Sequence, residues 1–179
     1  HISHISTIIT NGLVCKSGSS PYLQKDISDS SVQDKRSRRA VKIVPPNGTL
    51  HDYVPFYFAT RSPTLYHVHK NPGLHHGVKQ RELVYLKTTA QKIAGSGYSY
   101  VFTDGHGIML MTEQFGSLDK LSEVCWTTMR GTMWTDTNDE PDRKRRRQAE
   151  FLVHKHLAWD MIQELGVFDN QAQDSVKSI

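Results

Sequence analysis

The sequence predicts an α+β fold in a single domain that spans residues 1–179. Short apolar segments with strand periodicity are mixed with short helical segments, and the two kinds do not alternate as regular strand–helix–strand units do. The chain contains no internal repeat. A length of 179 residues is enough for one domain with a hydrophobic core. No run of about 18 apolar residues is present, so the sequence predicts no membrane span.

The N-terminal segment alternates between Ile and polar residues from His1 to Ser6, which predicts a strand. Residues 7–10 are expected to form a short helix that stops at Gly12. The chain has no initiating Met and the pattern is already present at residue 1, so we expect the chain to begin just inside the domain. A removed targeting segment is compatible with that start.

Residues 16–49 differ in composition from the rest of the chain. They are rich in Ser and carry the basic cluster 35–39, which predicts a loop, or a mobile region that covers a substrate, with little core. Residues 45–48, Pro-Pro-Asn-Gly, predict a turn.

The aromatic segment His51–Phe58 predicts a strand, and Pro55 places that strand at a sheet edge or bulge because proline cannot donate to a neighbouring strand. Ser62-Pro63 predicts the start of a helix or turn. Further strands are expected at 82–86, 98–103 and 150–153, and further helices at 89–94 (ended by Gly95), 118–126 and 159–165 (capped by Gly166). Residues 135–141 are expected to form a polar loop, and residues 143–149 a helix end or an ordered loop.

Composition and short motifs exclude several function classes. The net charge of +4 and pI near 9.1 are compatible with nucleic-acid binding but do not establish it. Two cysteines, Cys15 and Cys125, make neither a disulfide framework nor a zinc quartet, which favours a reducing compartment. No phosphate-binding loop, dinucleotide fingerprint or nucleophile elbow occurs.

Closely spaced histidines are the only candidate metal ligands, and they do not form a recognised site. Neither an HExxH motif nor a nearby cysteine accompanies them, so we predict no metal. These histidines are His67, His69, His75 and His76.

Two segments contain residues suited to catalysis or binding. The first, residues 51–66, places Arg61 directly after an aromatic strand, although a core strand followed by a solvated arginine would look the same. The second is the basic run Arg143–Arg147, which leads through Gln148 to Glu150 at the start of an apolar strand. In a strand, Gln148 and Glu150 would share a face. A carboxylate there can stabilise a developing positive charge, and a basic run can hold phosphates, but a solvated charge run with an ordinary edge glutamate is the alternative.

Together, four segments resemble the DarT family of DNA ADP-ribosyltransferase toxins. They are HISHIS at 1–6, HDYVPFYFATRSPTLY at 51–66, VFTDGHG at 101–107 and RRRQAEFLV at 145–153, in the family's order and over most of the chain. The resemblance implies an ADP-ribosyltransferase core of two small packed sheets with an NAD cleft between them. NAD would be a consumed substrate and not a cofactor: ADP-ribose passes to a base in single-stranded DNA, and nicotinamide is released. The resemblance also implies a macrodomain antitoxin as partner and a bacterial cytoplasmic location, and we expect a monomer.

The same resemblance assigns roles to individual residues. Glu150 matches the catalytic glutamate that bonds the 2′-hydroxyl of the nicotinamide ribose, and Arg61 matches an essential arginine of catalysis and NAD binding. His1 and Ser3 match the opening motif that holds NAD, and Tyr53 matches an aromatic residue of the strand that approaches the site.

The expected DNA-binding residues come from two segments. His106 matches a histidine on the DNA side of the cleft. The other DNA-binding residues are expected in the basic run and directly after it. They are Lys144, Arg145, Arg146, Arg147 and Gln148.

The Arg-Ser-Pro context of Arg61 resembles the thymidine-modifying branch of the family. Thymine N3 becomes a good nucleophile once its proton leaves, and an arginine is effectively always protonated, so Arg61 is not expected to act as a simple base. It would either stabilise the anionic thymine or hold a phosphate that orients the base. The segment between His4 and Gly12 is shorter than the family's usual helix, and residues 16–49 match only loosely, so the NAD contacts there are less defined.

Three alternatives stay open at this point. The acceptor could be guanosine in DNA, or a protein side chain, since a Gln-x-Glu motif also occurs in transferases that modify proteins. The protein could also be a non-enzymatic nucleic-acid binding module. NAD consumption separates enzyme from binding module, and the DNA dependence of that consumption separates the acceptors.

Overall fold

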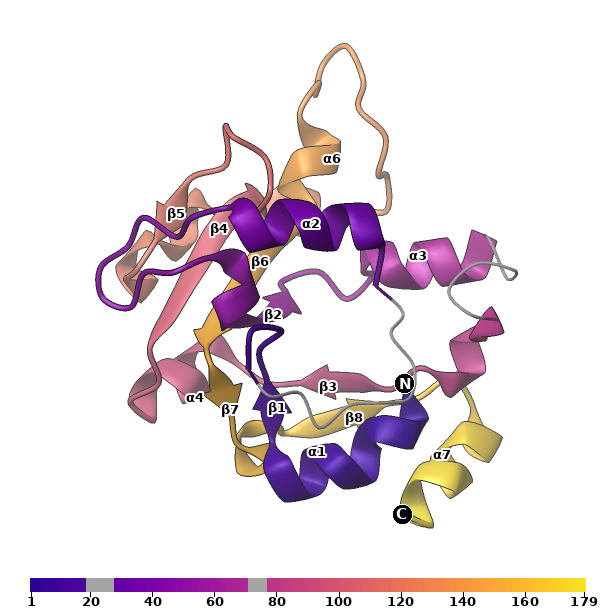
Figure 1. Ribbon diagram of the computed structural model, residues 1–179. Helices are drawn as coiled ribbons and strands as arrows, with labels where there is room; N and C mark the ends of the chain where they lie inside the picture. The colour runs from indigo at the N-terminus through magenta and orange to yellow at the C-terminus, as the bar shows by residue number, and fades with distance from the viewer. Residues whose placement is uncertain (19–27, 71–76) are drawn as a thin grey trace.

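The computed structural model describes residues 1–18, 28–70 and 77–179 of the chain. Its centre is a four-stranded antiparallel sheet in the order β2-β6-β4-β5 (Figure 1). The strands are β2 Tyr53–Tyr57, β4 Tyr100–His106, β5 Gln114–Phe115 and β6 Ala149–His154. Strands predicted at 51–58, 98–103 and 150–153 are confirmed, and Pro55 lies on the edge strand β2, as expected.

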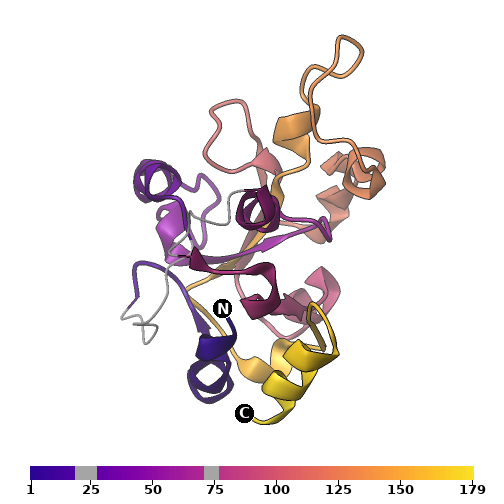
Figure 2. The ribbon, with the colours of Figure 1, turned by 90° about the vertical axis from the view of Figure 1, so that its right-hand side faces the viewer.

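Two small two-stranded sheets complete the β structure, so the α+β class is confirmed. Strand β1 (Leu13–Val14) pairs with β7 (His156–Leu157), and β3 (Tyr85–Lys87) pairs with β8 (Glu164–Gly166). Strand β3 overlaps the end of the strand predicted at 82–86. The start of that predicted segment belongs instead to a 3₁₀ turn, η4, at Gln80–Glu82. The two chain ends lie at the end of the molecule that carries β3 and β8 (Figures 1 and 2).

The N-terminus is helical, so the strand predicted for His1–Ser6 is wrong. A 3₁₀ turn, η1, covers Ile2–His4, and α1 covers Ile5–Asn11. Isoleucines 2, 5 and 8 are three residues apart, a helical spacing, and α1 buries Ile5 and Ile8. The predicted stop is confirmed, because Gly12 follows the helix with a φ of 70° that favours glycine.

Residues 16–49 contain a helix that the sequence analysis did not predict. Helix α2 covers Ser30–Arg38, and Oδ1 of Asp29 caps it by accepting hydrogen bonds from the backbone N–H groups of Ser31 and Val32. Residues 19–27 of this region lie outside the described part of the chain. The predicted turn at 45–48 is confirmed, with positive φ angles at Asn47 and Gly48.

Two of the remaining predicted helices are confirmed. They are α3, Pro63–Lys70, and α4, Ala90–Gly95, which Thr89 caps. The helix expected at 118–126 is a 3₁₀ segment, η5 Leu118–Glu123, followed by α5 Trp126–Arg130. The helix expected at 159–165 is wrong: a short 3₁₀ turn, η6 Trp159–Met161, precedes β8, which pairs with a strand far away in the sequence. The other helical elements are η2 Leu50–Asp52, α6 Arg143–Arg146 and α7 Asn170–Lys177.

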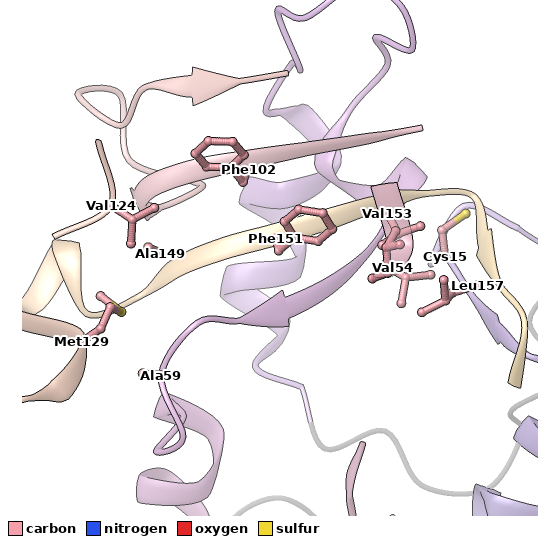
Figure 3. Close-up of a cluster of buried hydrophobic side chains, with 11 residues drawn as sticks. Cys15, Val54, Ala59, Phe102, Val124, Met129, Ala149, Phe151, Val153 and Leu157 are labelled. Carbon is pink, nitrogen blue, oxygen red and sulfur yellow. The ribbon is translucent and has the colours of Figure 1, made fainter. Parts of the chain in front are cut away.

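The two faces of the central sheet have different surroundings. Val54, Phe102, Phe151 and Val153 point to one face and belong to the main hydrophobic cluster, which Figure 3 shows along β6. Since side chains alternate along a strand, Tyr53 and Leu152 lie on the opposite face, and they belong to a smaller cluster. Helix α2 lies over this second face (Figure 1). Among the described residues no helix is long and apolar enough to cross a membrane.

Candidate active site

A cleft of about 490 Å³ lies on the sheet face that α2 covers. We call it the carboxylate cleft, because the buried carboxylate of Glu150 is part of its lining. Alternate residues of β2 line it, and so do residues of α2 at helical spacing, which one face of that helix supplies. The α2 residues that line the cleft are Val32, Gln33 and Arg36. Other lining residues include His1, Tyr53, Tyr57, His106, Gln148 and Glu150.

Glu150 is held firmly at the start of β6. It is 1% exposed, and it pairs with Tyr57 of β2, so the two side chains lie on the same face. On the other side the ladder with β4 is interrupted: four steps along β4, from Phe102 to His106, match two along β6. The hydroxyl of Thr103 fills this gap by accepting a hydrogen bond of 3.0 Å from the backbone N–H of Glu150. A bulge therefore sets the position and direction of the carboxylate.

Arg36 of α2 binds this carboxylate. Its Nη1 lies 2.8 Å from Oε1 and 3.0 Å from Oε2 of Glu150, and both side chains are buried. The sequence analysis missed Arg36, because its basic cluster was assigned to a solvated loop. Asp29 followed by Ser30 and Ser31 is the helix-start signal that could have placed a helix, and hence a buried arginine face, there.

The Arg36–Glu150 pair leaves one donor unused. Nη2 of Arg36 is buried and has no hydrogen-bond partner among the residues that the structure describes, although Arg36 lines the cleft. An ion pair that serves only stability would be expected to satisfy such a costly buried donor.

Three further groups shape the environment of Glu150. Burial lowers the pKa of His106 below its usual value against the opposing effect of the Glu150 carboxylate, which favours the neutral imidazole. Burial, and then the charge of Glu150, raises the pKa of Tyr57, which keeps its hydroxyl protonated. Gly107 provides space: a Cβ there would lie 2.8 Å from Oε2 of Glu150.

The predicted NAD-binding residues His1 and Tyr53 line the same cleft. Nδ1 of His1 accepts a hydrogen bond from the backbone N–H of Ser3, so Nε2 can donate to Glu82 at 3.3 Å. Ser3 is exposed and contacts the ring of His1, with its hydroxyl 2.7 Å from Nδ1. The hydroxyl of Tyr53 donates to the carbonyl of Asn47, and burial, followed by Asp52, raises the pKa of Tyr53 to about 12.

The basic run does not present all its charges to solvent. Arg145 is bonded to Asp142 and Asp104, and Arg146 shares Asp142. Lys144 is exposed, and its backbone carbonyl accepts a hydrogen bond from Gln148, which also lines the carboxylate cleft.

Arg147 is the most buried member of the basic run. It is 2% exposed; its Nη1 donates to the carbonyls of Thr128 and Gly131, and its guanidinium lies 4.5 Å from the ring centre of Trp134. Lys144 and Arg146 are thus the most exposed members of the run among those expected to bind DNA, whereas Arg145 and Arg147 are largely buried against internal partners.

Arg61 lies apart from the other predicted catalytic residue. It lines a second pocket of about 440 Å³, which we call the arginine pocket, and Glu150 does not line that pocket. Phe58 and Arg147 line this pocket, whereas their sequence neighbours Tyr57 and Gln148 line the carboxylate cleft. Phe58, Trp126 and Met129 line the arginine pocket and pack in the main hydrophobic cluster, whereas Leu50 and Tyr53 line the carboxylate cleft and belong to the smaller cluster, so the two pockets lie on opposite faces of the sheet.

No group of three or more His, Cys, Asp or Glu that could hold a metal ion occurs within residues 1–18, 28–70 and 77–179. Of the histidines considered as metal ligands, His75 and His76 lie outside the described residues.

Comparison with known proteins gives a consistent result. Over residues 1–179 the chain matches the family model described as ssDNA thymidine ADP-ribosyltransferase, DarT. It is 34% identical over 179 residues to a DNA ADP-ribosyl transferase of Thermus sp. (strain 2.9), which covers 100% of this chain and 83% of the relative.

Two solved structures of the Thermus sp. 2.9 DarT are also similar to this chain. One is a complex with ADP-ribosylated ssDNA (33% identity, TM-score 0.92) and the other a complex with NAD⁺ (32% identity, TM-score 0.88). Each match covers 99% of this chain and 83% of the solved chain.

Proposed function

The chain belongs to the DarT family of single-stranded DNA thymidine ADP-ribosyltransferases, and on that premise we propose how its residues carry out the reaction. The protein is an NAD-dependent enzyme that transfers ADP-ribose to thymidine in single-stranded DNA. The observation that carries the residue assignment is the buried carboxylate of Glu150 in the floor of a cleft large enough for a substrate.

The reaction exchanges one bond to the nicotinamide ribose for another. The bond between C1′ and the nicotinamide nitrogen breaks, and nicotinamide leaves with the electron pair as a neutral molecule. The bond between C1′ and thymine N3 forms, and N3 loses its proton to solvent. NAD is consumed as a substrate. Positive charge develops on the ribose between these events, so an anionic group placed beside it lowers the barrier.

Glu150 is the group that meets this developing charge. Its carboxylate accepts a hydrogen bond from the ribose 2′-hydroxyl and stabilises the oxocarbenium-like transition state. Each carboxylate oxygen has about two acceptor sites, and Nη1 of Arg36 uses one on each oxygen, so acceptor sites are left for the ribose.

Arg36 acts through Glu150 and not on the reacting atoms. By bridging both carboxylate oxygens it fixes the direction of the side chain, which increases the fraction of molecules with the acceptor correctly placed. We therefore treat Arg36 as a positioning residue.

The NAD side of the cleft is assigned to His1, Ser3 and Tyr53. Ser3 fixes the ring of His1 through the backbone N–H and the hydroxyl, and the ring lines the cleft. Tyr53 lies on β2 beside the cleft, with its hydroxyl held by the Asn47 carbonyl. These residues position NAD; they perform no proton transfer.

The DNA side is assigned to His106, Gln148, Lys144 and Arg146. Neutral His106 and Gln148 line the cleft near Glu150, where they can hydrogen-bond a base. Lys144 and Arg146 belong to α6, directly before Gln148, and are suited to backbone phosphates. For Arg61, the arginine pocket favours the second of the two roles considered above, that of holding a phosphate which orients the thymidine.

The experiment is incubation of the enzyme with NAD and single-stranded oligonucleotides, each lacking one base type, with adducts detected by mass spectrometry. We expect an ADP-ribose adduct on every oligonucleotide except the one without thymidine, and we expect nicotinamide release to depend on DNA. An adduct that follows guanosine would contradict the base assignment, and NAD consumption with no DNA adduct would contradict the acceptor class.

We also propose a bacterial cytoplasmic location and a macrodomain antitoxin that removes the modification. DNA and NAD are both present in that compartment, and the relatives that the chain matches are bacterial. Co-expression with a macrodomain that hydrolyses the adduct should relieve the enzyme's toxicity, whereas a catalytically inactive macrodomain should not.

A further inference from the structure

The arginine pocket contains three arginines and no acidic residue in its lining: Arg61, Arg130 and Arg147. Within residues 1–18, 28–70 and 77–179 none of the three forms an ion pair with a carboxylate. The nearby members of the basic run differ, since Arg143, Arg145 and Arg146 all pair with Glu140 or Asp142. The positive charge of this pocket is therefore not balanced inside the protein.

Arg147 supplies the buried part of this charge. It is 2% exposed, its Nη1 donates to backbone carbonyls, and its Nε has no hydrogen-bond partner among the described residues. Arg61 and Arg147 line the same pocket, and burial, followed by the positive charge of Arg61, lowers the pKa of Arg147. Like charges brought together in this way are costly unless an anion occupies the space between them.

The location of the pocket identifies the anion. Arg147 is three residues from Glu150, a span of at most about 11 Å along an extended chain, so a strand whose base enters the carboxylate cleft has nearby phosphates within reach of the arginine pocket. Trp126, Phe58 and Met129 give the pocket an aromatic and apolar wall, which suits a nucleotide better than a free inorganic anion.

We infer that the arginine pocket binds a backbone phosphate of the single-stranded DNA substrate, close along the strand to the modified thymidine. Arg61 and Arg130, which are both exposed, contact the phosphate, and buried Arg147 contributes its charge. The strand then passes around the end of the sheet, from the arginine pocket on one face to the carboxylate cleft on the other. This inference rests on the proposed function, because it assumes that single-stranded DNA is the acceptor.

The test measures binding of a short fluorescent oligonucleotide with one thymidine, as a function of salt. Arg61→Gln and Arg130→Gln should each weaken binding about fivefold and reduce the slope of log K against log salt by about 0.7, the contribution of one phosphate contact on single strands. Lys87→Gln is the matched control. It removes the same charge from an exposed residue of β3 that pairs with Glu164, so affinity and slope should stay close to those of the wild type.

A second measurement locates the phosphate. A neutral methylphosphonate replaces one phosphate at a time along the oligonucleotide. At one position the replacement should lower the affinity of the wild type but leave the affinity of Arg130→Gln unchanged, because that variant already lacks the contact. NAD affinity and the thermal midpoint of each variant check that the carboxylate cleft and the fold are intact.

The outcomes separate this inference from the proposed function. If both arginine variants match Lys87→Gln in affinity and slope while the wild type still modifies thymidine, the phosphate site is refuted and the proposed function stands. If the variants lose affinity and slope but the wild type forms no adduct, the phosphate site stands and the proposed function fails.

Discussion

The two pockets at the end of the central sheet use arginine in opposite ways. In the carboxylate cleft, Arg36 is buried against Glu150, so one positive charge meets one negative charge. In the arginine pocket, Arg61, Arg130 and Arg147 have no carboxylate partner among the described residues. In the carboxylate cleft, the arginine orients a carboxylate of the protein itself. In the arginine pocket, we expect the anion to come from a bound ligand. The number of arginines at a site therefore says little about its ligand until the partners of those arginines are known.

The largest expected effect comes from removing the charge of Glu150. Glu150→Gln keeps the shape of the side chain but removes the anion that meets the developing charge, so the rate of DNA modification should fall by about 10²–10³-fold. Oligonucleotide affinity should change little, because Glu150 does not line the arginine pocket. Single-turnover rates and anisotropy would measure the two quantities. If Glu150→Gln modified DNA at the wild-type rate, Glu150 would have no role in catalysis, and the carboxylate cleft would not be the catalytic one of the two pockets.

Arg36→Gln tests whether this arginine acts through the carboxylate. We expect kcat to fall by about 10–100-fold, but the double variant with Glu150→Gln should be no slower than Glu150→Gln alone, since the carboxylate to be positioned is then absent. Arg36→Gln alone should lower the thermal midpoint, because it leaves a buried carboxylate unpaired, and Glu150→Gln should partly restore it.

Arg38→Gln is the control for the Arg36 experiment, because Arg38 is exposed on the same helix. Additive losses of kcat in the Arg36–Glu150 double variant would show that Arg36 acts independently of Glu150 and does not position the carboxylate.

Gly107→Ala should have an intermediate effect that is confined to the carboxylate cleft. The added Cβ would lie 2.8 Å from Oε2 of Glu150 and 3.1 Å from Cδ1 of Leu50, and Arg36 restrains the carboxylate from moving away. A small displacement of a catalytic group is costly, so kcat should fall by about tenfold. Gly95→Ala is the matched control, since nothing lies within 4 Å of a Cβ there. If Gly107→Ala retained the kcat of Gly95→Ala, the carboxylate would not be held as tightly as the contacts indicate.

The sequence predicted the parts of the site that depend on local pattern. Short aromatic and apolar segments predicted β2, β4 and β6, and therefore the position of Glu150 at the start of an apolar strand. The N-terminal strand was wrong because alternation in HISHIS hid the three-residue spacing of Ile2, Ile5 and Ile8. The helix expected at 159–165 was wrong because β8 is defined by pairing with β3, a contact between distant segments that local pattern does not contain.

The partners of the charged residues were beyond sequence reasoning. Arg36 and Glu150 are 114 residues apart, and only the fold brings them together. The run Arg143–Arg147 looked uniform, yet Asp142 neutralises two of its members and the α5 carbonyls hold Arg147. Helical geometry at 142–146 could have indicated the Asp142 pairs, because residues three and four apart are neighbours on a helix.

The smallest expected effect concerns pH, and it distinguishes the two pockets again. The arginine pocket has no group in its lining that titrates between pH 5 and 8, whereas burial lowers the pKa of His106 in the carboxylate cleft. Burial also lowers the pKa of His51 and of His154.

Below pH 6.5 the unfolded chain therefore binds more protons than the folded protein, so the free energy of unfolding should rise with pH up to about 6.5 and then level off. Urea unfolding at pH 5.5 and 7.5 would measure this difference. His106→Gln should reduce it in part, since His51 and His154 still contribute, and an equal free energy of unfolding at the two pH values would contradict the burial of neutral histidine beside Glu150.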